Sequence, residues 1–513
     1  MTRTIPGAAG LAGRRVAVLG LGISGRAAVD VLRGKTQAIV SVWDGDAGKR
    51  ELYPELPGGF GLQPPALMDE LLAWQPDIVV IAPAFAEVGV EWTRLREAGI
   101  PVWSEIELAW QLRAQGEDGR YAPWLCVTGT NGKTTTVSML ASILAQAGLG
   151  GAPVGNVGNP AVSAVSDTGP NAPGAFALEL SSFQLYATYS MRPAGAICLN
   201  LSDDHLEWHD GRESYRAAKG RIYDGVTAAR VYPAGDTVVE GMVLDTTTRR
   251  PKTDAAQAGA DSAAAPRNVG LVLDVPGPGQ IGLVEDLIVD RAFVDNPAQA
   301  LQLFELSDIM HLGPAGQLPV HILRDALAAA ALARAIDVAP EHIAAGLRSF
   351  TAGKHRIEHV ATIDGVHYID DSKATNAHAA EASVRALERA VWIVGGLAKG
   401  AEFHELVAKV TPNVHAVVVI GTDQEPWKAA LAEFAGPVHY VDPEASDPME
   451  QAVAQASQWA KPGDTVILAP ACASMDQFVS YGDRGEKFAA AVGALSSSRG
   501  SHAGGEAEGG DDR

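Results

Sequence analysis

The chain has 513 residues, of which 47% are hydrophobic, and its formal net charge is −21. A chain of this length is too long for one hydrophobic core, and its apolar content excludes a disordered protein. The negative charge argues against nucleic acid and anionic membranes as partners, because both would repel it.

The first segment predicts a parallel α/β layer. Residues 14–19 read as a short apolar strand, followed by a glycine turn and the helical run SGRAAVDVLRG. The runs IVSVWD and PDIVVIAP read as further strands with helical stretches between them. This alternation is typical of a parallel sheet. The polar run 114–123 is the expected linker to the next segment.

The turn GLGISG, residues 20–25, matches the G-x-G-x-x-G pattern, and Asp44 ends the following strand. A dehydrogenase with Asp44 on a ribose hydroxyl is one interpretation. The physical requirement is only a helix N-terminus that accepts a diphosphate, so a UDP-sugar satisfies it equally well. A catalytic dinucleotide domain ahead of a phosphate loop would be unusual, and we therefore favour a substrate-anchoring role.

A second unit begins at WLCVTG, residues 124–129, and contains the loop GTNGKT, residues 129–134. The loop lies between a predicted strand and a predicted helix, which is the context of a nucleotide-binding phosphate loop. Lys133 would neutralise the β- and γ-phosphates of ATP, and the Thr134 hydroxyl would bind Mg²⁺. Val127 occupies the position of the first glycine of the strict pattern, so the loop is a variant.

Acidic and histidine residues follow two later strands of this unit. Glu179 ends the strand FALELSS, and the segment 200–224 contains Asp204, His205 and Lys219. Carboxylates and histidine near a phosphate loop are suitable ligands for Mg²⁺, although a solvated loop has the same composition. Because an ammonium group is unfavourable in a metal site, the local pattern predicts an exposed helical lysine at 219.

The rest of the chain adds an insertion and a third α/β unit. The Ala-rich run 245–268 predicts an exposed loop, and ILRDALAAAALARAI predicts a helix. AVWIVGG, AVVVIG and TVILAP read as strands of the third unit. The expected division is into domains 1–118, 119–352 and 353–495 and a disordered tail 496–513.

Cysteine usage and apolar run lengths bear on the compartment. Cys126, Cys198 and Cys472 lie far apart in apolar runs, which is neither a disulfide framework nor a zinc pattern. No apolar run approaches the ~20 residues of a membrane-spanning helix. We therefore expect a cytoplasmic protein that acts on small molecules, with no nucleic-acid or membrane partner, and a monomer.

Together the motifs resemble the Mur ligases, ATP-dependent amide-bond ligases that build the peptidoglycan peptide. The resemblance rests on GTNGKTTT, ELSSFQL, NLSDDHLEWH, YRAAKGRIY, HRIE, DDSKATN, GGLAKG and PACASMDQF. DDSKATN and PACASMDQF are similar to the D-glutamate-adding branch of the family. The resemblance implies an α/β fold of three domains: an N-terminal Rossmann-like domain for the UDP-linked substrate, a central P-loop ATPase-like domain, and a C-terminal Rossmann-like domain for the amino acid.

The resemblance also implies the reaction and the cofactors. ATP would phosphorylate the alanyl carboxylate of UDP-N-acetylmuramoyl-L-alanine, and the amine of D-glutamate would displace the phosphate, in cytoplasmic peptidoglycan precursor synthesis. Mg²⁺ and a carbamate formed from CO₂ on Lys219 are implied as cofactors. The implied catalytic residues are Lys133, Glu179, His205 and Lys219, and the implied metal ligands are Thr134, Glu179, His205 and carbamylated Lys219.

The remaining implied contacts divide among three substrates. The ATP contacts are Gly129, Thr130, Asn131, Gly132, Lys133, Thr134, Thr135, His355, Arg356 and Asp371. The contacts to the UDP-linked substrate are Gly22, Ile23, Ser24, Asp44, Asn156 and Ser181. The D-glutamate contacts are Asp204, Lys373, Thr375, Lys399, Ser474 and Tyr481, since ammonium and hydroxyl groups suit a dicarboxylate.

The sequence departs from the family pattern at three positions. Ala84 replaces a glycine next to the UDP-linked substrate, Ile322 replaces an asparagine that faces adenine, and Lys354 replaces a proline. Two alternatives therefore stay open: another amide ligase of the superfamily, such as a folate-extending enzyme, and a catalytically silent nucleotide-binding homologue. The GLGISG turn favours a UDP-linked substrate over folate.

Overall fold

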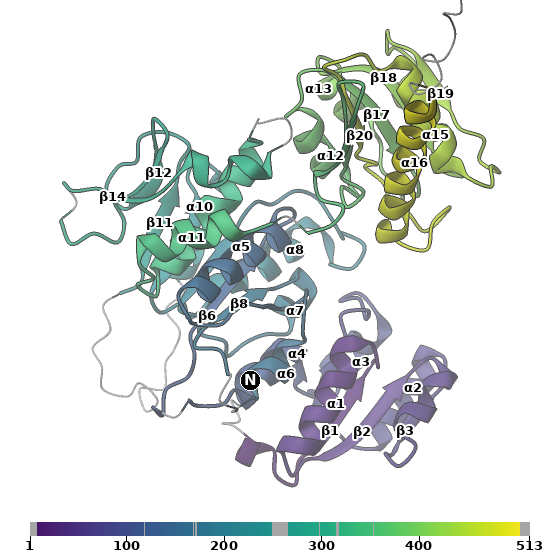
Figure 1. Cartoon of the computed structure of the whole chain (residues 1–513). Coiled ribbons are helices and arrows are strands. Elements are labelled where there is room, and N and C mark those ends of the chain that lie inside the picture. Colours follow the sequence, from purple (N-terminus) through teal and green to yellow (C-terminus); the bar gives the residue numbers. More distant parts are fainter. Residues whose placement is uncertain are drawn as a thin grey trace, which may run out of the picture. The chain divides into compact units, whose positions relative to one another are not determined.

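The computed structural model describes residues 8–502, except 117, 168, 170, 171, 249–264, 297, 314–317 and 352. The described residues form two compact units. The first unit holds the described residues up to Asp308 together with Arg324–Phe350, and the second holds Ile309–Leu323 and the described residues from Thr351 onward. Three β-sheets with associated helices make up the chain, two in the first unit and one in the second (Figure 1). The α/β fold expected from the sequence is thus confirmed, while the three domain boundaries stay predictions.

The N-terminal sheet is fully parallel, with the strand order β3-β2-β1-β4-β5. Its strands are β1 (Arg15–Leu19), β2 (Ile39–Asp44), β3 (Gly58–Phe60), β4 (Ile78–Ile81) and β5 (Val102–Trp103). The accompanying helices are α1 (Ile23–Lys35), α2 (Pro64–Ala73), α3 (Val90–Glu97) and α4 (Glu105–Leu112), with short 3₁₀ turns at Ala8–Leu11 and Ala47–Leu52. The glycine turn is confirmed between β1 and α1, where a Cβ at Gly25 would lie 1.8 Å from the Gly20 carbonyl oxygen.

The central sheet has nine strands in the order β14-β13-β12-β11-β10-β9-β6-β8-β7. Only β12–β13 and β13–β14 are antiparallel pairs. The strands are β6 (Trp124–Thr128), β7 (Pro153–Gly155), β8 (Phe176–Glu179), β9 (Gly195–Cys198), β10 (Ala229–Pro233), β11 (Arg267–Leu271), β12 (Gln280–Val284), β13 (Leu287–Asp290) and β14 (Leu301–Glu305).

Helices of the central region pack on this sheet and on one another. They are α5 (Lys133–Gln146), α6 (Ala161–Val165), α7 (Ser182–Tyr186), α8 (Gly211–Gly220), α9 (Thr237–Thr248), α10 (Val320–Arg334) and α11 (Pro340–Ser349), with 3₁₀ turns at Arg221–Tyr223, Leu306–Asp308 and Met310–Leu312. Helix α11 packs against α5, where the Ser142 hydroxyl donates to the Gly346 carbonyl at 2.7 Å. The helix predicted over ILRDALAAAALARAI is confirmed as α10.

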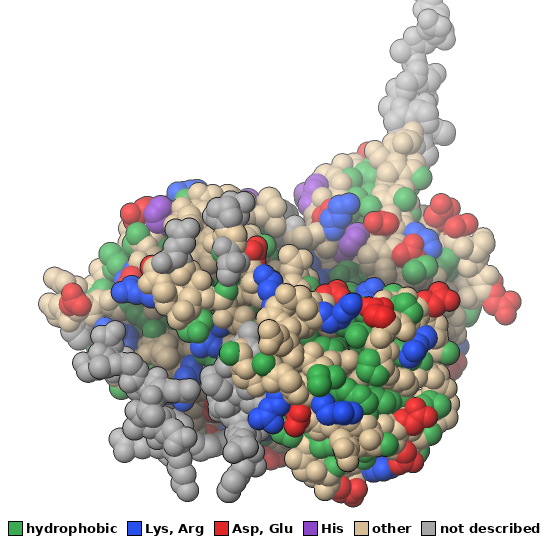
Figure 2. All heavy atoms as spheres, turned by 90° about the horizontal axis from the view of Figure 1, so that it is seen from below, with side chains coloured by type: hydrophobic (Ala, Val, Ile, Leu, Met, Phe, Trp, Pro, Cys, Tyr) green, Lys and Arg blue, Asp and Glu red, His purple; other side chains and the backbone are tan. Residues whose placement is uncertain are grey.

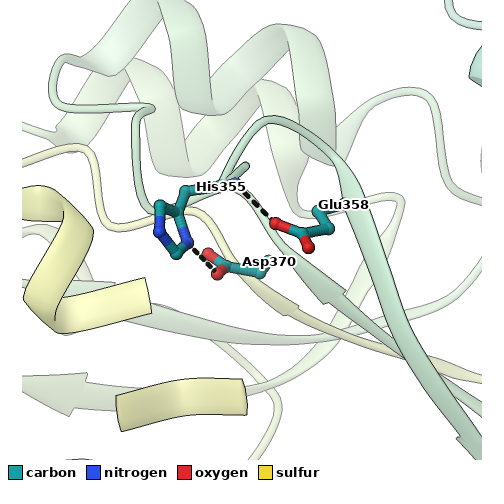
Figure 3. A group of neighbouring side chains, drawn as sticks. All are labelled: His355, Glu358 and Asp370. Atoms are coloured by element: carbon teal, nitrogen blue, oxygen red, sulfur yellow. Dashed lines mark hydrogen bonds and ion pairs between the residues drawn. The ribbon is translucent and has the colours of Figure 1, made fainter. Parts of the chain in front are cut away.

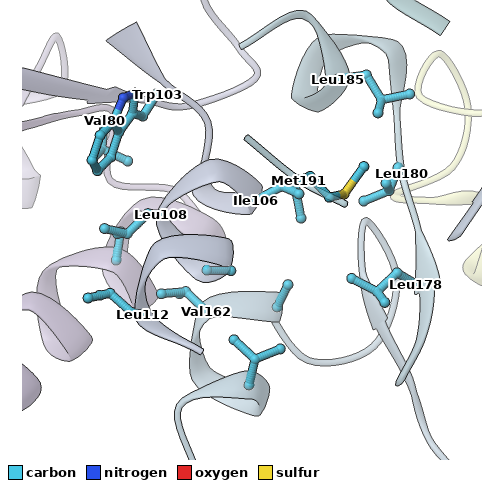
Figure 4. Packing of buried hydrophobic residues seen from close by; sticks show 14 of the residues in the cluster. Val80, Trp103, Ile106, Leu108, Leu112, Val162, Leu178, Leu180, Leu185 and Met191 are labelled. Carbon is cyan, nitrogen blue, oxygen red and sulfur yellow. The ribbon is translucent and has the colours of Figure 1, made fainter. Parts of the chain in front are cut away.

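One hydrophobic core lies beneath both sheets of the first unit. Leu108 and Leu112 of α4 belong to the same buried cluster as Val162 of α6 and Leu178 of β8. Figure 4 shows Leu108, Leu112 and Val162 close together. Side chains of the N-terminal sheet, including Val80, extend the cluster. The segment after β5 therefore contributes its apolar face to the central region as well as to its own sheet.

The third sheet lies in the second unit, with the order β15-β16-β20-β17-β18-β19 and one antiparallel pair, β15–β16. Its strands are β15 (Glu358–Ile363), β16 (Val366–Asp370), β17 (Ala390–Gly395), β18 (Val414–Ile420), β19 (Val438–Tyr440) and β20 (Thr465–Leu468). The helices are α12 (Ala377–Val384), α13 (His404–Val410), α14 (Glu425–Ala430), α15 (Pro448–Trp459) and α16 (Tyr481–His502). Trp392, Phe403 and Trp427 form an aromatic group in one of its buried layers.

Two predicted irregular segments differ from the structure at their edges. Helix α9 continues to Thr248 and β11 begins at Arg267, so only residues 249–266 separate these elements, and 249–264 lie outside the described residues. Helix α16 continues to His502, so the prediction of a disordered tail from residue 496 is wrong for 496–502. The helix extends because AAAVGALSSS retains enough helix-forming residues to propagate from the packed first turns. Residues 503–513 lie outside the described residues.

On the face drawn in Figure 2, acidic and basic side chains are interspersed among uncharged surface. The excess of acidic residues is thus not gathered into one patch on that face. Within the described residues, no helix combines the length and the hydropathy needed to cross a membrane.

Candidate active site

The phosphate loop follows β6, which lies between β9 and β8 in the central sheet, and leads directly into α5. Gly132 is the N-cap of α5 with a left-handed backbone, φ +82°, and Gly129 has φ +151°. A Cβ at Gly132 would lie 2.5 Å from Oδ1 of Asp325, so a larger residue would displace that carboxylate. The first-turn N–H groups of a 14-residue helix are suited to bind phosphate, and the assignment of residues 129–135 to ATP stays a prediction.

Asn200, which follows β9, holds the loop from the side. Its Oδ1 accepts the backbone N–H groups of Thr130 at 3.1 Å and of Asn131 at 2.9 Å, and its Nδ2 donates to the Asn131 carbonyl at 3.2 Å. The Thr130 hydroxyl is further fixed by Tyr215 at 3.1 Å. Sequence reasoning missed Asn200, whose only signal is a polar side chain directly after a strand that neighbours β6.

Removal of the Asn200 side chain is expected to weaken ATP binding. An Asn200→Ala variant removes the side-chain acceptor of the Asn131 N–H and the donor to the Asn131 carbonyl, while the Thr130 N–H keeps the Asn200 backbone carbonyl as acceptor. We expect the KM for ATP to rise about tenfold, equivalent to ~1.4 kcal/mol. Steady-state kinetics with varied ATP measure this effect. Asn268→Ala, at an exposed position of β11, is the matched control and should leave the KM unchanged. An unchanged KM in Asn200→Ala would show that the loop keeps its conformation without this side chain.

Two lysines donate to one carbonyl oxygen of the loop. Lys133 Nζ lies 2.9 Å from the Gly129 oxygen, and Lys219 Nζ, from α8, lies 2.8 Å from the same oxygen. Lys219 is only 2% exposed, so the exposed lysine expected from the local pattern is wrong. Burial, and next the charge of Lys133, lower the pKa of Lys219 to about 7. A large fraction of this amine is therefore neutral near neutral pH.

Glu179 presents an unpartnered carboxylate oxygen at the end of β8. The residue is 2% exposed, its Oε1 accepts from Asn156 Nδ2 at 2.8 Å, and its buried Oε2 has no hydrogen-bond partner. A buried anionic oxygen without a donor is costly unless a cation compensates it. The strand neighbours β6, so the oxygen belongs to the same sheet edge as the phosphate loop. Glu179 therefore fits the role of a Mg²⁺ ligand. Thr134 is half-buried at the second position of α5, directly after the phosphate-loop lysine.

His205 and Asp204 are less enclosed than the other predicted site residues. His205 has φ +54°, its side chain is 48% exposed, and its Nε2 lies 3.5 Å from Asp204 Oδ2. Among the described residues, no group of three His, Cys, Asp or Glu ligand atoms within 4.8 Å includes Glu179 or His205. The structure thus does not bring the predicted metal ligands Glu179 and His205 together in such a group.

His209 is a buried histidine in the same segment as His205, and it is not among the predicted catalytic residues or metal ligands. The Nδ1 atom of His209 lies 3.3 Å from Glu87 Oε2, and its Nε2 atom lies 3.0 Å from Ser182 Oγ. Glu87 also accepts a hydrogen bond from the Ser214 hydroxyl at 2.5 Å. Burial lowers the pKa of His209 against the opposing effect of Glu87. Trp208 Nε1 donates to the Pro83 carbonyl at 2.8 Å, beside Ala84. These contacts fix the loop after β4 to the segment that carries His205.

Four of the six predicted UDP-side residues, Gly22, Ile23, Ser24 and Asp44, lie in or beside the turn after β1. Ile23 is 70% exposed at the start of α1, and Gly22 is also exposed. Asp44 is buried, and its Oδ2 accepts from the Leu21 N–H at 2.7 Å and from Lys49 Nζ at 3.0 Å. Burial alone would raise the pKa of Asp44, but these donors outweigh it and lower that pKa. The carboxylate therefore shapes the turn itself. Of the other two residues, Asn156 binds Glu179 and Ser181 caps α7.

The second unit holds the remaining predicted residues. His355 is buried with φ +65°, and its Nδ1 lies 2.7 Å from Asp370 Oδ2. Asp371 is 6% exposed and accepts from Ser383 Oγ at 2.5 Å and from the Ile357 N–H at 3.3 Å. Burial raises the pKa of Asp371 to about 7, against the opposing hydrogen bond from Ser383. Its carboxylate is thus largely enclosed by protein donors.

The predicted D-glutamate residues of this unit differ in exposure. Lys373 Nζ lies over the Tyr481 ring, 5.2 Å from its centroid, so the structure brings these two together. Thr375 and Lys399 are exposed, and Lys399 has φ +52°. Ser474 is 4% exposed, in the segment after β20. His355, Glu358 and Asp370 form a cluster whose ligand atoms lie within 4.8 Å of one another, but Figure 3 shows these groups already paired with each other.

Two family models match the chain. The model of the Mur ligase middle domain matches residues 127–268, and that of the Mur ligase glutamate ligase domain matches residues 355–472. The first contains the phosphate loop, Glu179 and Lys219, and the second contains the His355 cluster. The class of protein is therefore that of the Mur ligases.

Curated relatives place the chain more narrowly. A UDP-N-acetylmuramoylalanine--D-glutamate ligase of Streptomyces coelicolor is 46% identical over 484 residues, covering 94% of this chain and 98% of the relative. A protein of the same name from Mycobacterium avium is 40% identical over 508 residues, covering 94% of this chain and 96% of the relative. The chain belongs to the Mur ligase family, in the branch of the UDP-N-acetylmuramoylalanine--D-glutamate ligases.

Solved structures share the fold. A pseudomurein peptide ligase type C from Methanothermus fervidus superposes with a TM-score of 0.52 at 16% identity, covering 94% of this chain and 100% of that chain. A MurF ligase from Thermotoga maritima, solved in complex with ADP, gives a TM-score of 0.51 at 16% identity, covering 95% of this chain and 96% of that chain. At these identities the likeness concerns the fold alone.

Proposed function

We propose that the protein is an ATP-dependent ligase that joins D-glutamate to UDP-N-acetylmuramoyl-L-alanine and releases ADP and phosphate, in peptidoglycan precursor synthesis. The observation that carries the proposal is the arrangement of side chains at the carboxyl ends of β6 and β8 in the central sheet. There the Gly129 carbonyl binds both Lys133 and buried Lys219, and Glu179 offers an unpartnered oxygen. The 46% identity to a ligase of that name supports the choice of substrates.

The chemistry proceeds in two displacements. An oxygen of the alanyl carboxylate attacks the γ-phosphorus of ATP, the bond from that phosphorus to the β–γ bridging oxygen breaks, and ADP leaves. The resulting acyl phosphate is attacked by the neutral amine of D-glutamate, which loses a proton as the tetrahedral intermediate expels phosphate. A carboxylate needs this activation because its own oxygen is a poor leaving group. Positioning and electrostatic stabilisation account for most of the catalysis.

The phosphate-loop residues hold the triphosphate in this scheme. The loop amides and the N-terminus of α5 bind phosphate oxygens, and Lys133 moves its hydrogen bonds from the loop carbonyls to the β- and γ-phosphates. Thr134 and Glu179 are the residues that would hold one Mg²⁺, and His205 would hold a second; the ions would neutralise charge that develops on the transferred phosphoryl group. The unpartnered oxygen of Glu179 supports this assignment.

Lys219 is suited to carbamylation. Its neutral amine adds to CO₂: a C–N bond forms, one C–O π bond of CO₂ breaks, and one proton leaves to solvent, so a neutral group becomes an anion that could orient a metal or its water. Burial and the charge of Lys133 lower the pKa of the amine to about 7, so a large fraction is neutral near that pH, where a surface lysine would be protonated. The carbamate also removes the repulsion between Lys219 and Lys133 on one carbonyl oxygen.

The remaining substrates are assigned to the residues implied by the resemblance. The turn at 20–25, Asn156 and Ser181 would bind the UDP-linked substrate, with Asp44 acting through the turn that it supports. His355, Arg356 and Asp371 would lie on the nucleotide side. D-Glutamate would be bound by Asp204, Lys373, Thr375, Lys399, Ser474 and Tyr481. We further propose a three-domain organisation and a cytoplasmic monomer.

The proposal is tested by ADP release across candidate amino acids. Purified protein with ATP, Mg²⁺ and UDP-N-acetylmuramoyl-L-alanine should release ADP only when D-glutamate is added. Turnover with L-glutamate or meso-diaminopimelate in its place would move the assignment to a sister ligase. ATP binding without turnover at saturating substrates would identify a silent homologue.

The CO₂ dependence of activity should follow the ionisation of Lys219. A pKa lowered to about 7 means that the amine is mostly protonated below this pH and mostly neutral above it. Added bicarbonate should therefore raise the initial rate more at about pH 8 than at about pH 6 in CO₂-depleted buffer, because the protonated amine does not add CO₂. The comparison uses initial rates measured at both pH values, once with a fixed total concentration of CO₂ and once without added CO₂. A rate that CO₂ depletion leaves unchanged at both pH values would contradict carbamylation.

A further inference from the structure

Arg484, on the first turn of α16, is a fully buried cation with no assigned role. Its side chain is 0% exposed, and burial lowers its pKa to about 10, so the guanidinium stays charged at neutral pH. A buried charge is costly unless its donors are satisfied. Arg484 makes three hydrogen bonds, from Nε to Ser372 Oγ at 2.9 Å, from Nη2 to the Ser372 carbonyl at 2.7 Å, and from Nη1 to the Cys472 carbonyl at 3.1 Å.

The acceptors of Arg484 lie beside the residues proposed for D-glutamate. Ser372 directly precedes Lys373, and Cys472 lies two residues before Ser474. The Ser372 hydroxyl also donates to the Tyr481 carbonyl at 2.8 Å. One guanidinium thus joins the turn after β16, the segment after β20 and the start of α16. Each of these three segments carries one of the proposed D-glutamate residues.

The same network continues to the strained His355 turn. Asp370 accepts the Ser372 N–H at 2.9 Å through Oδ1 and contacts His355 Nδ1 through Oδ2. The His355 N–H is bound by Glu358 at 2.7 Å, as Figure 3 shows, and its carbonyl accepts the Lys373 N–H at 3.2 Å. Lys373 is therefore fixed through its backbone on one side by His355 and through Ser372 on the other.

Gly485 leaves the space that this network needs. A Cβ at this position would lie 2.1 Å from His355 Nδ1 and 2.6 Å from Asp370 Oδ2. Any larger residue would push the imidazole away from its carboxylate partner. The pair Arg484-Gly485 thus combines a buried donor with a close backbone approach at the same point of the fold.

We infer that Arg484 is a positioning residue for the amino-acid substrate: it fixes Lys373, Ser474 and Tyr481 relative to one another without touching the substrate. The inference rests on the proposed D-glutamate ligase function. A lysine cannot replace the arginine, because a single ammonium cannot reproduce donors directed at two separate segments in a planar fork. Loss of the clamp should therefore weaken D-glutamate binding more than ATP binding.

The test compares Arg484→Lys and Ser372→Ala with the wild-type protein. Wild-type ADP release with D-glutamate is measured first, so that a failure of the proposed function is seen there and a failure of the inference is seen in the variants. We expect Arg484→Lys to raise the KM for D-glutamate about tenfold or more, while the KM for ATP stays within about twofold. Ser372→Ala, which removes only the hydroxyl contacts, should raise the same constant by a smaller factor.

Lys487→Ala is the matched control. Lys487 lies one turn further along α16, is half exposed, and pairs with Asp483 at 3.2 Å. Its replacement should change neither KM. An unchanged KM for D-glutamate in folded Arg484→Lys would overturn the inference, and so would an equal rise in both KM values. If Arg484→Lys does not fold, Ser372→Ala decides by the same two criteria.

Discussion

A Lys219→Ala variant is expected to lose turnover by about a thousandfold and to regain part of it when a small carboxylic acid is supplied. The side chain is buried against the Gly129 carbonyl, so its removal leaves a cavity beside the phosphate loop. A formate or acetate ion can enter such a cavity and restore the anionic group that the carbamate would provide. ADP release measured over a range of added acid reports the rescue.

Lys133→Ala is the matched control for this experiment, because Lys133 donates to the same carbonyl oxygen. It should lose activity to a similar extent, and carboxylic acids should not restore it, since the missing group there is a cation. Incorporation of labelled CO₂ into the wild-type protein, detected by carbon NMR, is an independent readout. Near-normal turnover of Lys219→Ala without any effect of added acid would rule out the carbamate.

A Glu179→Gln variant should lose at least about a hundredfold in kcat and require more Mg²⁺. Glutamine keeps an oxygen that can accept from Asn156, but it removes the negative charge from the buried oxygen that has no protein partner. The effect should therefore concern the metal and leave the fold intact. The thermal unfolding midpoint should not fall, because no hydrogen bond between protein groups is lost.

Mg²⁺ titrations of activity, and Mn²⁺ binding to the protein measured by electron paramagnetic resonance, test this expectation. Glu207→Gln is the control, since the Glu207 side chain is 82% exposed in the segment that carries His205. It should behave as the wild type. Wild-type Mn²⁺ affinity and kcat in Glu179→Gln would show that the carboxylate is not a metal ligand.

Much of the fold could be predicted because it is encoded locally. Alternating apolar strands and helical runs indicate parallel sheets, and Gly20, Gly129 and Gly132 mark positive-φ backbone that other residues rarely adopt. The end of α16 was mispredicted because composition alone does not show how far a packed helix propagates.

The site could be predicted only where a motif spans adjacent residues. The burial of Lys219 depends on the Gly129 carbonyl, 90 residues earlier in the chain, so the pattern within α8 predicts exposure wrongly. Asn200 accepts from the Thr130 N–H, about 70 residues earlier in the chain, and Arg484 donates to Ser372, 112 residues earlier. Such partners are set by topology, and a single sequence gives no direct signal for them.

The shared core of the first unit has a consequence for dividing the protein. Seven of the eight residues of α4 are buried. Glu105 Oε1 accepts the Val162 N–H at 2.5 Å, and Glu107 Oε2 accepts the Tyr189 N–H at 2.7 Å. A fragment that ended near residue 118 would keep α4 and lose both partners, and it would expose the apolar face drawn in Figure 4. A cut on either side of α4 therefore exposes apolar surface, because this helix packs on the N-terminal sheet as well as on the central region.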